Sequence, residues 1–132
     1  MTMSEPDLKK RTKAFALRIL KLVDALPKTT SGRALAAQLV RSGTSVAANY
    51  RAARRAKSPA HFLSKLGDVE EEADETLFWP ELLEESGIVP EKRLSALKKE
   101  ADELVAIIVA SINTAKKRGA EKSQAISKRG SG

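Results

Sequence analysis

The side chains best suited to bind a charged ligand form a basic row between residues 31 and 57, where no acidic residue occurs. The row comprises Arg33, Arg41, Arg51, Arg54, Arg55 and Lys57. Guanidinium and ammonium groups make charge-assisted hydrogen bonds to phosphate oxygens, so such a row on one helix could follow a nucleic-acid backbone. A second basic group lies near the C-terminus. The candidate nucleic-acid-binding residues are therefore Arg51, Arg54, Arg55, Lys57, Lys116, Lys117 and Arg118.

Enzymatic chemistry has little support in the residue types. The sequence holds one histidine, His61, and no cysteine. It has no glycine-rich phosphate loop and no His-Glu-x-x-His pattern, and a di-iron site in a helical bundle would need two Glu-x-x-His pairs. The carboxylates between Glu70 and Glu75 occupy most sides of a helix, which indicates a solvated or ion-paired surface. We expect no enzymatic activity, no cofactor and no metal, with His61 on the surface near a helix start.

Length and composition bound the class of protein. A chain of 132 residues is long enough for one domain with a buried core. The absence of cysteine excludes disulfides. No apolar segment approaches the roughly 20 residues that a membrane span needs, and the N-terminal charges are not followed by the apolar run of a secretory signal. We expect a cytoplasmic protein that does not enter the membrane.

Apolar residues recur every three or four positions in four successive segments, as on one face of a helix. Only seven glycines and five prolines occur in the chain. The pattern predicts an all-α protein, an antiparallel up-down-up-down four-helix bundle over residues 1–118. The predicted helices span about residues 7–26, 32–57, 59–86 and 90–117. Residues 119–132 are expected to form a flexible basic C-terminal tail.

The same spacing predicts which side chains form the core. On the first two helices these are Leu8, Phe15, Ile19, Leu22, Leu26, Leu35, Leu39, Ser42, Val46, Tyr50 and Ala53. On the last two they are Phe62, Leu66, Val69, Ala73, Thr76, Leu83, Leu94, Leu97, Ala101, Leu104, Ile108 and Ile112. Each set keeps a helical period, so each helix should turn one face inward.

Capping residues and prolines predict where the helices begin. Asp7 is a plausible N-cap of the first helix, and Thr30 or Ser31 of the second. Ser58 followed by Pro59 is typical of an N-cap and first helical residue. Pro80, inside the third helix, removes one backbone hydrogen bond and should bend the helix near Trp79.

Small residues in the second helix predict close packing. Gly43 lies in the helix interior, where it costs about 1 kcal/mol relative to alanine, and the approach of a neighbouring helix would compensate. Tyr50 continues the apolar face, so its ring should be buried with its hydroxyl near a polar partner, and Asn49 could hydrogen-bond across a helix interface. The expected structural or interface residues are Arg41, Gly43, Asn49, Tyr50, Glu75 and Trp79.

Charge is distributed unevenly between neighbouring helices. Residues 58–88 carry nine acidic groups and one basic group. In an antiparallel hairpin joined near residue 57, Arg41 lies level with Asp74 and Glu75, whereas Arg51 lies level with Lys65. Arg41 thus has an intrachain partner at hand, and Arg51, Arg54 and Arg55 do not.

Two interpretations of these three arginines stay open. They could contact a nucleic-acid backbone, with weak sequence preference because aromatic residues are few. Alternatively, the protein is a structural or assembly module, in which the basic second helix meets an acidic third helix of a neighbouring subunit or a protein partner. The two roles can coexist.

The segment from Arg41 to Arg51, Arg-Ser-Gly-Thr-Ser-Val-Ala-Ala-Asn-Tyr-Arg, resembles the signature of the bacterial 23S ribosomal RNA intervening-sequence proteins. The likeness continues in Phe62–Leu66 and in Glu75–Trp79 and covers roughly residues 8–115. Pro80 departs from it, because the family more usually carries a helix-compatible residue after the tryptophan.

This resemblance implies a small up-down helical bundle that forms a ring-shaped homo-oligomer of five subunits. A related accessory protein of diversity-generating retroelements is similar in shape and binds nucleic acid, which implies RNA or DNA as a partner. The family has no established enzymatic activity.

Overall fold

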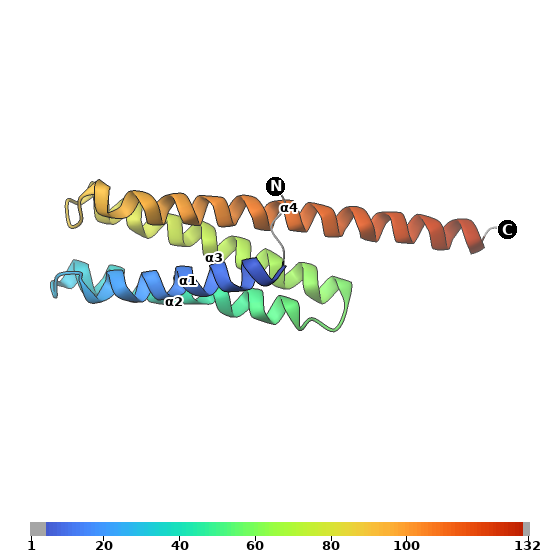
Figure 1. The fold of residues 1–132 in the computed structure, drawn as a ribbon, viewed down its shortest axis with the longest axis horizontal. Coiled ribbons are helices and arrows are strands. Elements are labelled where there is room, and N and C mark those ends of the chain that lie inside the picture. The colour runs from blue at the N-terminus through green and yellow to red at the C-terminus, as the bar shows by residue number, and fades with distance from the viewer. Residues whose placement is uncertain (1–4, 131–132) are drawn as a thin grey trace.

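The computed structural model describes residues 5–130, which form four α-helices joined by short turns (Figure 1). The helices are α1 (Glu5–Asp24), α2 (Thr30–Arg54), α3 (Pro59–Glu85) and α4 (Glu91–Gly130). Successive helices pack against each other, and the connecting turns alternate between the two ends of the molecule. The described part of the chain is therefore an all-α bundle with up-down-up-down order, as the apolar spacing predicted.

The inward faces of the helices follow the predicted period. All six predicted positions of α4 are buried, from Leu94 to Ile112. On α2 the buried set runs from Leu39 to Ala53, and on α3 from Leu66 to Leu83. Leu22, Leu35 and Phe62 are only partly buried and pack against the edge of the core. The helical period thus identified most of the core, and these three residues lie at its edge.

Two of the three predicted N-caps are displaced. The cap of α2 is Thr29, whose hydroxyl accepts a hydrogen bond from Gly32 N at 3.1 Å. The prediction of Thr30 or Ser31 was wrong by one or two residues, because three neighbouring hydroxyls offer equivalent caps in sequence. Helix α1 begins at Glu5, so Asp7 lies in its first turn.

The joint between α2 and α3 agrees with its prediction. The Ser58 hydroxyl accepts from His61 N at 3.1 Å, and Pro59 stands at the start of the helix. Pro80 does not end α3, which continues to Glu85. Neighbouring packing therefore outweighs the missing backbone hydrogen bond at Pro80, a residue buried in the fold.

Helix α4 does not end near residue 117 as predicted, because it continues as one helix to Gly130. Its final part extends past the other three helices (Figure 1), and every residue from Lys116 to Arg129 is exposed. Ala120, Glu121, Lys122, Gln124 and Ala125 are good helix formers. Their combined propensity continues the helix that the bundle has already nucleated, despite the one glycine.

Helix α1 approaches α2 closely at Gly43. A Cβ atom placed on Gly43 would lie 2.7 Å from Ile19 Cγ1 and 3.0 Å from Ile19 Cγ2. Ile19 is completely buried, and its branched side chain has little freedom to move aside. The glycine thus provides the space in which α1 sits, as the sequence predicted, and compensates there for its low helix propensity.

Helices α1 and α4 pack against each other more sparsely than the three pairs of successive helices do. The edge between them is bridged by Arg11, whose Nε and Nη2 atoms each lie 2.7 Å from one of the two Glu100 carboxylate oxygens, and which also pairs with Glu103. The hydrogen bond to Glu100 raises the pKa of the Arg11 side chain. A forked ion pair therefore closes the bundle where apolar packing is thinnest.

We expect Gly43→Ala to lower the free energy of unfolding by about 1–2 kcal/mol, because overpacking against Ile19 outweighs the gain in helix propensity. The measurement is a urea titration followed by circular dichroism. Gly67→Ala is the matched control, since a Cβ there meets nothing within 4 Å and should stabilise by about 0.5–1 kcal/mol. Equal stabilisation by both changes would contradict a tight α1–α2 contact.

Candidate nucleic-acid interface

The basic residues at the end of α2 surround its joint with α3. Arg51 and Arg54 stand in the last turn of α2, Arg55 is its C-cap, and Lys57 lies between the helices. All four side chains are exposed. Because the Ser58 cap fixes the start of α3 with only four residues between the two helices, these cations are held close together at one end of the bundle.

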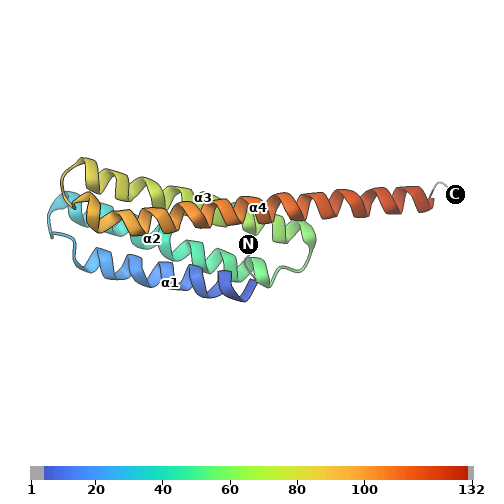
Figure 2. The same cartoon turned by 45° about the horizontal axis from the view of Figure 1, so that its top comes forward.

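The second basic group meets the first at this end. Figures 1 and 2 show α4 passing the α2–α3 joint and continuing beyond it. Arg118 and Lys122 of α4 line one pocket together with Arg54 and Lys57. Lys116 and Lys117 are exposed in the same turns of α4 but do not line that pocket. Two groups far apart in sequence therefore form one basic end of the bundle.

This basic end, defined by the seven candidate residues and Lys122, differs from the prediction in one respect. Within residues 5–130, neither Arg51 nor Arg55 makes an ion pair. Arg54, which was expected to lack an intrachain partner as well, does take part in an interaction. Arg51 and Arg55 are thus the α2 arginines of this end most available to an external anion.

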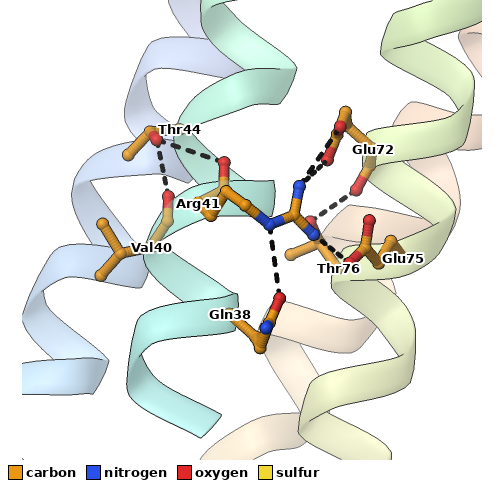
Figure 3. Close-up of polar contacts among 7 residues, drawn as sticks. All are labelled: Gln38, Val40, Arg41, Thr44, Glu72, Glu75 and Thr76. Atoms are coloured by element: carbon orange, nitrogen blue, oxygen red, sulfur yellow. Dashed lines mark hydrogen bonds and ion pairs between the residues drawn. The ribbon is translucent and has the colours of Figure 1, made fainter. Parts of the chain in front are cut away.

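Arg41, in the middle of α2, forms ion pairs with carboxylates of α3 (Figure 3). Its Nη1 lies 3.2 Å from Glu72 Oε2, its Nη2 pairs with Glu75, and its Nε donates to Gln38 Oε1 at 3.3 Å. The sequence predicted Asp74 and Glu75 as the partners of Arg41, because they lie level with it in the antiparallel hairpin. Glu72 replaces Asp74 because residues three apart share a helix face, whereas adjacent residues do not.

The other structural candidates lie within the bundle. Tyr50 is 4% exposed and has an interaction partner, so its predicted burial is confirmed. Trp79 packs against the core edge and meets Phe78 at a ring-centroid distance of 5.1 Å. Asn49 is partly buried, and its side chain makes no hydrogen bond to the described residues. A role for Asn49 at an interface between subunits stays a prediction.

The acidic residues of α3 form a separate surface. One hollow is lined by Glu70, Glu71 and Asp74, together with Gly67 of the same helix and Val105 of α4. Among residues 5–130 no three acidic or histidine side chains are arranged to hold a metal ion. His61 is exposed in the first turn of α3, away from this hollow along the helix. The acidic surface and the basic end therefore lie at different levels of the bundle.

Comparison with known proteins identifies the fold's relatives. The family model for 23S rRNA-intervening sequence proteins matches residues 5–110. The chain belongs to this family. The match ends before Lys116, so the basic group on α4 lies beyond the part of the chain that the family model covers.

A solved structure shares this fold. It is a protein of unknown function from the S23 ribosomal protein family of Bacteroides thetaiotaomicron, with 31% identity and a TM-score of 0.79. The match covers 84% of this chain and 99% of that one. No curated protein matches the sequence. Within residues 5–130, no helix has both the length and the apolar character needed to cross a membrane.

Arg41 and Arg51 should differ in their effect on stability. We expect Arg41→Gln to lower the free energy of unfolding by about 0.5–1 kcal/mol, because it removes exposed ion pairs with Glu72 and Glu75. Arg51→Gln, the matched control on the same helix, should change it by less than about 0.5 kcal/mol. Denaturant titrations at low salt and at about 1 M NaCl measure both, and the difference should shrink at high salt. An equal loss for the two variants would mean that Arg51 is paired as well.

Proposed function

We propose that this protein is a non-enzymatic, homo-oligomeric helical bundle that binds the backbone of RNA or DNA through its basic end. The observation that supports this is the meeting of two basic groups, from α2 and from α4, at one end of the fold. No acidic residue occurs between residues 31 and 57, and Glu121 is the one acidic residue between 116 and 132. A polyanion that spans both groups could contact Arg51, Arg55, Lys116 and Lys117, all of which are exposed.

The binding would be led by charge. Each phosphate neutralised by a lysine or arginine releases condensed counterions, so affinity should fall steeply with salt. Aromatic side chains are few in the sequence, with one Trp, one Tyr and three Phe, and Tyr50 and Trp79 belong to the bundle interior or its edge. A platform that stacks many successive bases is therefore not part of the proposal.

Self-association has its own support. Leu17 and Leu20 of α1 are 59% and 40% exposed, and residues three apart lie on one helix face. Phe78 of α3 is 48% exposed. Neighbouring exposed apolar side chains can form part of a contact surface for a partner. We propose that a second copy of this chain covers the α1 pair and that the assembly closes as a ring of five.

The assembly proposal is tested by size-exclusion chromatography with light scattering. The expected mass is several times that of the 14.3 kDa chain. Replacing Leu17 and Leu20 by glutamate should shift the mass toward that of one chain, because a charged contact would replace an apolar one. The same change at Ser95 and Ala96, two exposed positions of α4, is the control. A single-chain mass for the wild type at micromolar concentration would overturn the proposal.

The binding proposal is tested by reversing charge at Arg51, Arg54 and Arg55. Changing all three to glutamate should weaken binding to a fluorescently labelled RNA of about 20 nucleotides by about a hundredfold near 0.1 M salt. It should also reduce the slope of log affinity against log salt by about one for each phosphate that is no longer neutralised. Fluorescence anisotropy across a salt series measures both quantities, and the triple change is needed because single surface pairs contribute only about 0–1 kcal/mol.

The matched control reverses three exposed cations of α4 at the opposite end, Lys92, Arg93 and Lys99. It changes the net charge equally, so it separates a local site from the general attraction of a basic protein. Equal loss of binding in the two triple variants would contradict a site at the basic end. Loss of the oligomer in the first variant, with RNA binding unaltered per chain, would instead favour the assembly module, in which these arginines meet an acidic α3 of a neighbouring subunit.

A further inference from the structure

The pocket between α2, α3 and α4 offers a ligand more than positive charge. Its volume is about 620 Å³, within the range of sites that hold small organic ligands. Arg54, Lys57, Arg118 and Lys122 supply its cations. Phe62 supplies an aromatic surface, and Gly119 leaves one wall without a side chain. The pocket thus combines positive charge with an apolar surface.

We propose that this pocket holds one unpaired nucleotide of a single-stranded nucleic acid. The phosphate would lie against the cations, and the sugar and base against the apolar side formed by Phe62 and the neighbouring alanines. This rests on the proposed function and deepens it, because it names the form of nucleic acid that the basic end selects. The predicted preference is for single strands or duplex ends over continuous duplex.

The chemistry of the walls supports a nucleotide over a bare phosphate. Four cations alone would suit any polyanion, but an aromatic ring beside them suits a ligand with a planar apolar part. Phe62 is partly buried and packs on the edge of the core, so its position is fixed before a ligand arrives. A base held in a duplex has its faces covered by its neighbours and could not present one to Phe62.

Gly119 faces the pocket from α4 and lies outside the buried core of the bundle. Ala115, Gly119 and Lys122 line the pocket and lie four and three positions apart, on one face of α4. A Cβ at Gly119 would meet no atom within 4 Å. Since Gly119 lines the pocket and a Cβ there has open space around it, a larger side chain at this position would occupy part of the pocket without changing the charge of the protein.

Gly119→Leu is accordingly the decisive variant, and Ala120→Leu is its matched control. Both substitutions place leucine on the exposed end of α4, but Ala120 is exposed and does not line the pocket. Both variants should retain the helix, because leucine is a good helix former. The probes are a labelled single-stranded RNA of about 12 nucleotides and an RNA duplex of the same length, closed at both ends by non-nucleotide linkers.

We expect Gly119→Leu to weaken single-strand binding about five- to a hundredfold, the range for loss of one base–aromatic contact. Binding of the closed duplex, and of either probe to Ala120→Leu, should be unchanged. Phe62→Leu, which keeps an apolar side chain at the core edge, should weaken single-strand binding in the same direction. Circular dichroism of each variant confirms that the helices are retained.

The outcomes separate this inference from the proposed function. Normal single-strand binding by Gly119→Leu would overturn the pocket while leaving charge-led binding at the basic end intact. Failure of the wild type to bind either probe would overturn both. Equal weakening of single strand and closed duplex would show a general weakening of charge interactions and overturn the nucleotide assignment. Competition by free adenosine or uridine monophosphate at concentrations near the affinity of the single strand would assign the pocket to a small nucleotide instead of a strand.

Discussion

The rotation of α2 about its own axis is the constraint on which the rest of the structure depends. Gly43 admits Ile19 on one side, and Arg41 is tied to Glu72 and Glu75 of α3 on another (Figure 3). With these contacts made, a helix of regular pitch has no freedom left in where its later residues point. Arg51 and Arg55, which follow the buried Tyr50, are then directed outward at the basic end.

Helix length decides where the second basic group stands. At 1.5 Å per residue, the 40 residues of α4 span about 60 Å, against about 40 Å for the 27 residues of α3. The difference carries the end of α4 past the α2–α3 joint. Because the extension is helical, Arg118 and Lys122 lie four positions apart on one face of α4, where they line one pocket with Arg54 and Lys57.

The sequence was sufficient wherever a local period or a local cap determines structure. It identified the core faces, the Ser58–Pro59 start of α3 and the space beside Gly43, because each follows from helix geometry within one segment. It was insufficient where several segments decide together. The carboxylate Glu72 and the pocket at Phe62 and Gly119 depend on how α2, α3 and α4 are rotated against each other. The composition of residues 119–132, with its glycines, serines and basic residues, predicts a tail, whereas the structure continues α4 to Gly130 from the helix already formed in the bundle.

The basic end lies apart from the exposed pair Leu17 and Leu20 of α1. This separation bears on how nucleic-acid binding and self-association combine. Leu17 and Leu20 lie in the interior of α1's length, away from the α2–α3 joint. In a ring built through Leu17 and Leu20, with the bundles parallel to the symmetry axis, every copy would present its basic end toward the same side. Contacts that are weak singly would then act on one strand at high effective concentration, since binding by one copy holds the strand near the others. Assembly would thus strengthen nucleic-acid binding without adding a contact to any one chain, and the α4 extensions would surround the site from several sides.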